Sequence, residues 1–296
     1  MIIIDYSQIA ISSLMAELRG HTDAEISTPL VRHMIINTIR SYKNKFGEEY
    51  GEIVIACDNK KYWRKKVFTH YKANRKKTRD TSGFNWSAIF EALNQIKIEL
   101  AEFFPYPVID VNMAEADDVI AALVEWTQTN NLVQEGLEMT PQPVLILSGD
   151  HDFTQLQRYK NVRQFSPVQK VWIKADGNID VILMEHILSG DKGDGIPNFL
   201  SPDDVFVSGG RQKSIRKKDL EVWKTQSLIS HWMESEHSIN IHRNAVLIDL
   251  RNIPQDIIES IVLSYTLQHN MKSKAQLLNY FMAHDMKHLM EHLTEF

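Results

Sequence analysis

Short apolar runs recur along the first 175 residues of the chain, and most of them are followed by acidic residues. A run of this length is typical of a strand that is buried on both faces of a parallel sheet. The pattern therefore predicts strands at Ile2–Ile4, Ile53–Cys57, Val108–Val111, Val144–Leu147, Val162–Phe165 and Val171–Ile173.

Between these runs, apolar residues recur three and four positions apart, which is typical of amphipathic helices. This spacing predicts helices over Ser27–Phe46 and Phe84–Phe104. A further helix is predicted to begin with Asn112 as its N-cap, because Asn112 and Glu115 have the spacing of a capping box.

Strands and helices alternate to about residue 185, which predicts an α/β fold with a central, mainly parallel sheet flanked by helices. A loop rich in glycine and acid follows at Gly190–Pro197, and the pattern is helical from Asp219 to Phe296. We therefore expect two domains: an α/β domain of residues 1–186 and a smaller, mainly helical domain of residues 187–296.

The acidic residues that follow the strands are expected to meet at one edge of the sheet. Asp5, Asp58 and Asp150 closely follow three of the strands, and the functional crevice of an open α/β sheet lies outside the carboxyl ends of its strands. Asp117 and Asp118 would lie in the first turn of the helix after the third run, where the helix dipole favours negative charge. Carboxylates this close repel one another, and bound Mg²⁺ or Mn²⁺ would resolve the repulsion.

Composition and charge narrow the possible partners. The chain has 296 residues, of which 43% are hydrophobic and 24% charged, as is ordinary for a globular protein. Residues 60–79 contain ten Lys or Arg and no acid, so removing them from the net charge of −5 leaves −15. An acidic body with one basic segment suggests a polyanionic partner held beside a metal centre. A solvated charged helix is the alternative.

The single cysteine, Cys57, excludes an intrachain disulfide and favours a reducing, intracellular setting. No apolar stretch approaches the length of a membrane span, and the first residues lack the pattern of a signal peptide. We therefore expect no membrane partner.

Six short motifs resemble those of the 5′-nuclease family, which includes flap endonucleases and phage 5′-exonucleases. They are Ile4–Gln8, Cys57–Asn59, Tyr71–Arg75, Glu115–Asp118, Ser148–Leu156 and Gly190–Pro197. Each motif alone is a weak signal, but together they occur in the family's order and approximate spacing. The resemblance covers nearly the whole chain, is closest to the T4-type phage RNase H, and implies a PIN-like nuclease core with a basic arch at residues 59–84.

The resemblance implies a centre with two Mg²⁺ ions, for which Mn²⁺ would substitute. Two such ions can activate a water and stabilise a leaving oxygen in one in-line displacement of a phosphodiester. Asp117 and Asp150 are expected to be catalytic, together with Lys72 and Arg75, which match the family's pair that grips the scissile phosphate. The acids that match the first ion are Asp5, Asp58, Glu115, Asp117 and Asp150; those around the second are Asp152, Asp191 and Asp194, with Asp118 between the two groups.

Two nucleic-acid-binding regions are also implied by the resemblance. In the arch, Lys72 and Arg75 would share one face if the segment is helical, and Tyr71 would either stack on a base or simply pack. The family's common Gly-x-Gly-x-Lys-Thr-Ala stretch is replaced here, so we expect charge, rather than a bound monovalent cation, to hold the duplex. The candidates are Arg64, Tyr71, Lys72, Arg75 and Lys76 in the arch, and Arg211, Lys213, Arg216, Lys217 and Lys218 beyond it.

Three histidines near the end of the chain have no counterpart in the resemblance. His284, His288 and His292 stand four apart and would share one helical face. This spacing can bind Zn²⁺ or Ni²⁺, but an exposed face of the last helix is the favoured interpretation.

The leading hypothesis is a Mg²⁺-dependent 5′-3′ nuclease that removes RNA primers and 5′ flaps from DNA and RNA–DNA duplexes during phage DNA replication. The resemblance places such a protein, as a monomer, in the cytoplasm of the infected bacterial host, with a single-strand-binding protein and a sliding clamp as possible partners. Two alternatives stay open: a PIN-like ribonuclease acting on single strands, and a non-catalytic DNA-binding protein with structural metals.

Overall fold

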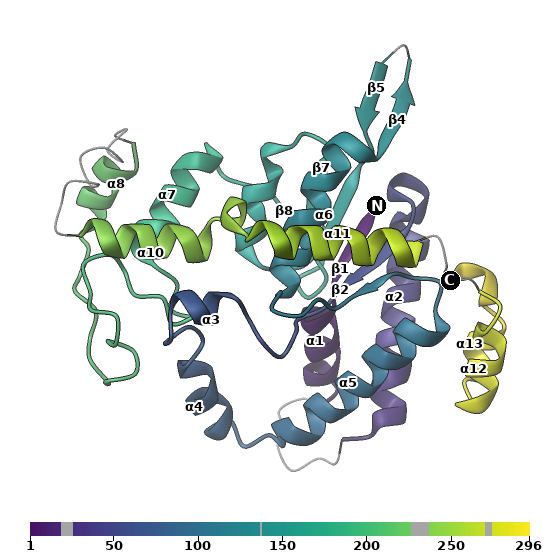
Figure 1. Ribbon diagram of the computed structural model, residues 1–296. Coiled ribbons are helices and arrows are strands. Elements are labelled where there is room, and N and C mark those ends of the chain that lie inside the picture. The colour runs from purple at the N-terminus through teal and green to yellow at the C-terminus, as the bar shows by residue number, and fades with distance from the viewer. Residues whose placement is uncertain (19–25, 137, 226–236, 270–273) are drawn as a thin grey trace.

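The computed structural model describes residues 1–18, 26–136, 138–225, 237–269 and 274–296, and it shows a central sheet with helices on both faces (Figure 1). The six strands of the sheet lie in the order β3-β2-β1-β6-β7-β8. They are β1 (Ile2–Asp5), β2 (Ile53–Ala56), β3 (Val108–Ile109), β6 (Val144–Leu147), β7 (Val162–Ser166) and β8 (Val171–Ile173). All neighbouring strands are parallel except β7 and β8, which confirms the predicted mainly parallel sheet.

The alternation of side chains along the strands explains why both faces of the sheet are covered. Ile2 and Ile4 of β1 belong to one apolar core, and Ile3 belongs to another. The first core includes residues of α1 (Tyr6–Leu18), α2 (Thr28–Tyr50), α5 (Trp86–Phe103), α12 (Leu277–Ala283) and α13 (Lys287–Met290). The second includes residues of α6 (Ala116–Asn130) and α11 (Gln255–His269).

The register of the central strands places their carboxyl ends level with one another. Asp5 of β1 is paired with Ala56 of β2, and Ile4 is paired with Leu147 of β6. The chain therefore leaves β1, β2 and β6 at the same edge of the sheet, which is where the sequence predicts the functional crevice.

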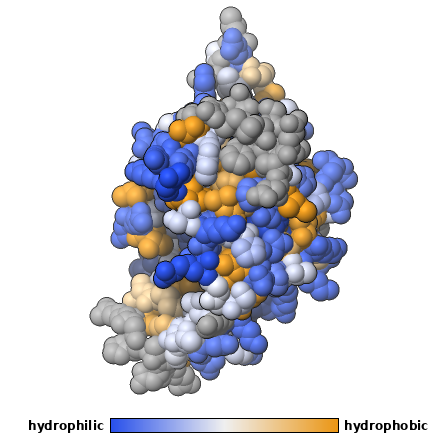
Figure 2. Space-filling view, turned by 90° about the vertical axis from the view of Figure 1, so that its left-hand side faces the viewer, coloured by the Kyte–Doolittle hydropathy of each residue, from blue (hydrophilic) through white to orange (hydrophobic). Residues whose placement is uncertain are grey.

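The other elements are a hairpin, several further helices and short 3-10 turns. The hairpin of β4 (Leu132–Glu135) and β5 (Glu138–Pro141) projects from the body at the top of both Figure 1 and Figure 2. The remaining helices are α3 (Arg64–Val67), α4 (Asn74–Asp80), α7 (Ile179–Ser189), α8 (Lys217–Thr225) and α10 (Ser238–Ile248), with 3-10 turns η1 (His151–Arg158), η2 (Leu250–Asn252) and η3 (Leu293–Glu295).

The helix after β3 begins later than its sequence predicts. Met113 has a φ of 72°, a left-handed conformation that a helix cannot contain, so Asn112 is not the N-cap. Glu115 caps α6 instead, and the carboxylate of Asp118 accepts a hydrogen bond from the Glu115 amide in return. The expected capping box exists, but it lies three residues further along the chain.

The three C-terminal histidines do not share a helical face, contrary to the expectation. α12 ends at Ala283, and α13 begins at Lys287. Asp285, between them, has a φ of 52°, which breaks the helix because L-residues cannot continue a right-handed helix there. His284 therefore belongs to a different element from His288 and His292.

The C-terminal helices are not separated from the sheet. Ile257 and Ile261 of α11 join the same apolar core as Val119 and Leu123 of α6. The boundary near residue 186 consequently crosses a shared core, and the division into two domains stays a prediction. No helix among the described residues is both long and apolar enough to span a bilayer.

Candidate functional site

Three carboxylates meet where the central strands end. Asp5 is the last residue of β1, Asp58 lies two residues after β2, and Asp150 caps η1 shortly after β6. The Ser148 hydroxyl donates a hydrogen bond of 3.1 Å to Asp5, and the Ser7 hydroxyl donates one of 2.7 Å to Asp58. Short polar side chains in the first turn of α1 and directly after β6 thus fix the positions of these acids.

The crowding of these acids changes their protonation. Burial, and then repulsion from Asp58, raises the pKa of Asp5 to about 7. Burial is also the largest cause of the raised pKa of Asp117 and of Asp150, and repulsion from Asp152 adds to the pKa shift of Asp150. The charge of Lys72 acts to lower the pKa of Asp117, but burial and the neighbouring acids outweigh this effect.

A buried arginine holds the acids at the start of α6. Arg64, only 2% exposed, lies 2.9 Å from Glu115 and 2.8 Å from Asp118, and it donates to the Leu247 carbonyl. Although burial opposes it, attraction to Asp118 and Glu115 raises the pKa of Arg64. Trp63 Nε1 also donates to Asp118 (3.1 Å). Asp118 is therefore fully enclosed by protein partners.

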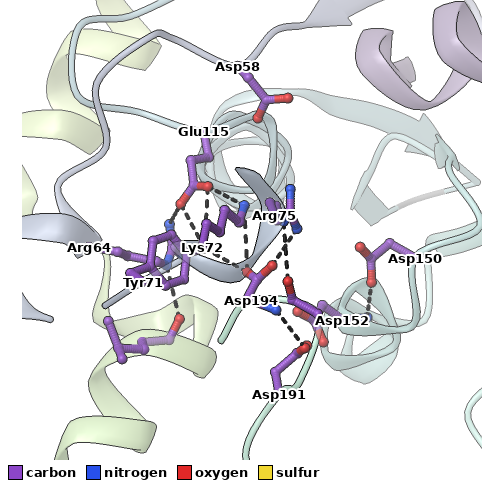
Figure 3. A network of polar contacts seen from close by, with 12 residues as sticks. Asp58, Arg64, Tyr71, Lys72, Arg75, Glu115, Asp150, Asp152, Asp191 and Asp194 are labelled. Carbon is purple, nitrogen blue, oxygen red and sulfur yellow. Dashed lines mark hydrogen bonds and ion pairs between the residues drawn. The ribbon is translucent and has the colours of Figure 1, made fainter. Parts of the chain in front are cut away.

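The base of the arch faces the same acids (Figure 3). The Tyr71 hydroxyl bonds both Glu115 (3.0 Å) and Asp194 (2.7 Å). Lys72 forms an ion pair with Glu115 and lies 3.5 Å from Asp194, which also pairs with Arg75. Burial opposes ionisation of Lys72, but Asp194 and Glu115 raise its pKa above the ordinary value. Cations of the arch thus point into the acidic centre.

Backbone contacts tie the arch to the Gly190–Pro197 loop. The Lys72 amide donates to the Asp194 carbonyl (2.7 Å), and Asn74 Nδ2 donates to the Lys192 carbonyl (2.8 Å). Gly190 has a φ of 68°, and a Cβ there would lie 2.4 Å from the Ile196 carbonyl oxygen. Only glycine fits this turn, so the loop that carries Asp191 and Asp194 has a conformation fixed by sequence.

A histidine joins the acids of this loop. His186 of α7 lies between Asp152 (3.2 Å from Nδ1) and Asp191 (3.5 Å from Nε2). Burial opposes protonation, but hydrogen bonds to the two carboxylates raise the pKa of His186 to about 10. Burial acts to raise the pKa of Asp191, but hydrogen bonds from His186 and from the Asp194 and Gly193 amides together lower it to about 2.

Comparison with known proteins identifies the family of the chain. Residues 1–181 match the 5′-3′ exonuclease N-terminal resolvase-like domain, and residues 177–296 match the T4 RNase H C-terminal domain. The chain is 32% identical to the ribonuclease H of enterobacteria phage T4 over 302 aligned positions, which cover 99% of this chain and 95% of the relative. The chain belongs to the 5′-3′ exonuclease family of the T4 RNase H type. Like its relatives, it is a phosphodiester-hydrolysing nuclease.

Solved structures share the fold of this 5′-3′ exonuclease family member. The bacteriophage T5 D15 flap endonuclease, in a pseudo-enzyme–product complex with DNA and metal ions, matches with a TM-score of 0.61 at 15% identity, covering 91% of this chain and 98% of the other. T5 5′-exonuclease with bound divalent zinc ions matches with a TM-score of 0.60 at 15% identity, covering 91% and 99%. At this identity the likeness establishes the fold alone.

Most of the predicted acids of this nuclease come together. Asp58, Glu115, Asp150, Asp152 and Asp194 lie around one another in Figure 3, with Asp191 on the adjoining loop. Asp5 is linked to them by the Ser148 hydroxyl, which donates to Asp5 and accepts from the Asp150 amide, and Asp117 follows Ala116, whose amide donates to Asp58. The predicted acids thus gather in one acidic centre, in which ligand atoms of Asp152, His186 and Asp191 lie within 4.8 Å of one another. Their division between two ions stays a prediction.

Three predicted residues have different surroundings from those expected. Arg64 and Tyr71 are each only 2% exposed. Tyr71 therefore packs in the interior, which is the alternative to stacking on a base, and nucleic-acid binding by Arg64 stays a prediction. Both side chains hold Glu115. Asp118, at 0% exposure, forms an ion pair with Arg64 and accepts hydrogen bonds from Trp63 and the Glu115 amide. Its Oδ1 has no hydrogen-bond partner among the described residues, and its place in the metal centre stays a prediction.

The condition under which Lys72 and Arg75 would share a helical face is not met. Lys72 has a φ of 56° and precedes α4, which begins at Asn74. The two cations nevertheless converge, because both contact Asp194. Lys76, further along α4, is exposed.

The second basic region lies on the surface around α8. Asn198 Nδ2 donates to the Lys213 carbonyl (2.8 Å), and the Ser201 hydroxyl accepts from the Lys213 amide (2.9 Å), so the segment before α8 has a hydrogen-bonded conformation. Arg216 pairs with Asp219. This side of the molecule faces the viewer in Figure 2. The exposed cations are Arg211, Lys213, Arg216, Lys217 and Lys218.

The donor set fits divalent cations. It consists of carboxylate oxygens, which Mg²⁺ and Mn²⁺ prefer, and burial and mutual repulsion raise the pKa of Asp5 and Asp150. His186 was not identified from the sequence, because it belongs to none of the motifs and its partners Asp152 and Asp191 lie in other segments. Its position four residues before Gly190, on the turn preceding the acidic loop, was the only available signal.

Proposed function

We propose that the chain is a Mg²⁺-dependent 5′-3′ nuclease that removes RNA primers and short 5′ flaps from RNA–DNA and DNA duplexes during phage DNA replication. The observation that carries the proposal is the meeting of acids from separate strand ends with the cations of the arch at one sheet edge. As a replication enzyme it would act as a monomer in the cytoplasm of the infected host.

Two divalent ions would be held by separate parts of the acidic centre. Asp5, Asp58, Asp117 and Asp150 are suited to the first ion, and Asp152, Asp191 and Asp194 to the second. When bound, the ions would supply an activated water and stabilise the leaving oxygen of the phosphodiester. Glu115 and Asp118 support the first group, because Arg64 fixes both carboxylates in the interior.

Lys72 and Arg75 would grip the scissile phosphate. Both now pair with Asp194, and both are tied by backbone contacts to the loop that carries it. Once Asp194 has a cation of its own, the ammonium and guanidinium groups are released to face a phosphate beside the acids. Positioned cations that meet developing negative charge are an effective catalytic device.

A cleft under the arch suits a single strand. Its volume is about 1000 Å³, and it opens between α4 and α5 beside Asp58. The lining combines aromatic and basic side chains, the combination that holds unpaired nucleotides by stacking and charge. They are Tyr62, Trp86 and Phe90 with Lys60, Arg75, Arg79, Lys97 and Lys192. A displaced 5′ end could therefore reach the acids through this cleft.

The exposed cations around α8 would hold the duplex backbone without reading sequence. DNA and RNA–DNA duplexes with 5′ ends, forks or flaps are the proposed substrates. A phage single-strand-binding protein and a sliding clamp are proposed as partners, as the family resemblance suggests, with no docking surface assigned to either.

The test is cleavage of an RNA–DNA hybrid labelled at either end of the RNA strand. With Mg²⁺, we expect short products from the 5′ label first, and no product after chelation. Asp150→Asn should abolish cleavage while leaving DNA affinity within about threefold, since phosphate contacts carry most of the affinity. The exposed acid Asp176→Asn, outside the centre, is the matched control.

Three outcomes would overturn the proposal. Products released only from the 3′ end would reject the polarity. Equal cleavage of single-stranded RNA, with no advantage for a duplex, would favour the PIN-like ribonuclease. Binding without cleavage under any divalent ion would favour the non-catalytic DNA-binding protein.

A further inference from the structure

A second cluster of metal-binding side chains lies far from the acidic centre. His288, Glu291 and His292 each offer a ligand atom, and these atoms all lie within 4.8 Å of one another. The cluster belongs to α13 and the turn after it, at the opposite edge of the molecule from α3, α4 and α8 (Figure 1). It is therefore independent of the nuclease site.

The geometry points to a transition-metal site, and we propose that His288, Glu291 and His292 bind one Zn²⁺ or a similar borderline divalent ion. Two imidazoles and one carboxylate form a common three-ligand set for Zn²⁺, with water completing the tetrahedron. Mg²⁺ is a poor candidate because it prefers oxygen ligands. In a tetrahedral zinc site the ligand atoms lie roughly 3.4 Å apart, a contraction that exposed side chains reach by small rotations.

A fourth residue already orients one of the ligands. Nδ1 of His292 lies 2.7 Å from a carboxylate oxygen of Glu295. With the Nδ1 proton donated there, Nε2 of His292 retains its lone pair for a metal. Metal-bound histidines commonly donate their other nitrogen to a carboxylate in this way.

Glu295 is itself held by the body of the protein. Arg40 of α2 donates to it (3.2 Å), and Asn44 donates to the same oxygen. These contacts link the cluster to α2, and the neighbouring Leu289 and Phe296 are buried in the first apolar core. The backbone around the ligands is therefore fixed before any ion binds, which lowers the entropic cost of binding.

His284, the third histidine of the sequence pattern, is excluded from the site. Its ring packs on Tyr280, with 4.5 Å between ring centroids, and it precedes the break before α13. Glu291 takes the place that the sequence pattern assigned to His284. Because His284 lies outside the cluster, its substitution by alanine is a matched control within the same segment.

The test is calorimetric titration of the full chain with Zn²⁺ in saturating Mg²⁺, which occupies the acidic centre. We expect one equivalent of Zn²⁺ to bind and to raise Tm by a few degrees. His288→Ala and His292→Ala should each lose that equivalent, and His284→Ala should keep it. Glu295→Gln should weaken it by roughly 10–100-fold.

Equal Zn²⁺ binding by the wild type and His292→Ala would overturn the proposal. So would loss of the equivalent in Asp150→Asn with retention in His292→Ala, because the ion would then belong to the acidic centre. Circular dichroism of each variant establishes that the fold is intact. The nuclease assay is not needed for this result, so its outcome is independent of the proposed function.

Discussion

At the scale of single residues, two cations of the arch have similar charges but different surroundings. Lys72 is enclosed between Glu115 and Asp194, whereas Lys76 is exposed on α4. Burial strengthens the field of a charge on a nearby phosphate, and an exposed charge is screened by salt. The two residues should therefore contribute to different steps.

Lys72→Ala is expected to lower kcat by about 10²–10³-fold, with a small change in affinity for the duplex. Lys76→Ala should leave kcat unchanged and weaken binding, with a shallower dependence of affinity on salt. Single-turnover rates and binding isotherms at two salt concentrations measure both effects. A Lys72→Ala defect confined to affinity would make Lys72 a positioning contact.

The role of His186 could not be predicted from the sequence. Its imidazolium is a cation that lies between Asp152 and Asp191, so it would compete with a metal ion for the carboxylate oxygens of these two residues. His186→Ala should lower the Tm of the metal-free protein and tighten apparent Mg²⁺ binding. Calorimetry and a Mg²⁺ titration of cleavage measure the two effects, with the exposed His151→Ala as control. Weaker Mg²⁺ binding would instead make His186 a ligand.

At the scale of elements, the strands of the central sheet were predictable from the sequence, whereas the contacts of the arch were not. Apolar runs such as Val144–Leu147 are expected to be buried, so their pattern alone predicts the sheet and its acidic edge. The burial of Arg64 and Tyr71 could not be predicted, because a basic segment looks solvent-exposed until its partners are known. Those partners, Glu115 and Asp194, come from distant parts of the chain. Local pattern cannot show such pairings.

The loop that carries Asp191 and Asp194 offers a test at this scale. Gly190→Ala would force a Cβ to within 2.4 Å of the Ile196 carbonyl in a left-handed conformation. We expect a loss of Tm and a loss of activity of tenfold or more, since the arch is anchored to the same loop. Gly177→Ala, also left-handed but with open space around it, is the matched control for backbone strain. Equal activities for the two variants would separate the loop from catalysis.

At the scale of the whole molecule, the separation of acidic and basic residues makes the stability of the fold depend on a bound metal ion. An acidic body and a basic arch oppose each other across one centre, and in the metal-free protein the arch cations and His186 neutralise part of the acid. Bound protons neutralise part of the negative charge that is left, because the pKa of Asp5 is about 7 in the folded state. Protons and divalent ions therefore compete for the same oxygens.

This competition predicts opposite pH trends with and without metal. The folded pKa of Asp5, about 7, lies above its ordinary value of 3.8, so the folded state holds an extra proton between these pH values and loses that stabilisation as the pH rises through 7. His186, with a folded pKa of about 10 against 6.5, acts in the same direction above pH 6.5. The metal-free Tm should therefore fall from about pH 6 to about pH 8, while the increase in Tm caused by Mg²⁺ should grow. Asp5→Asn should flatten the metal-free slope, and an unchanged slope in that variant would show that Asp5 does not carry the linkage.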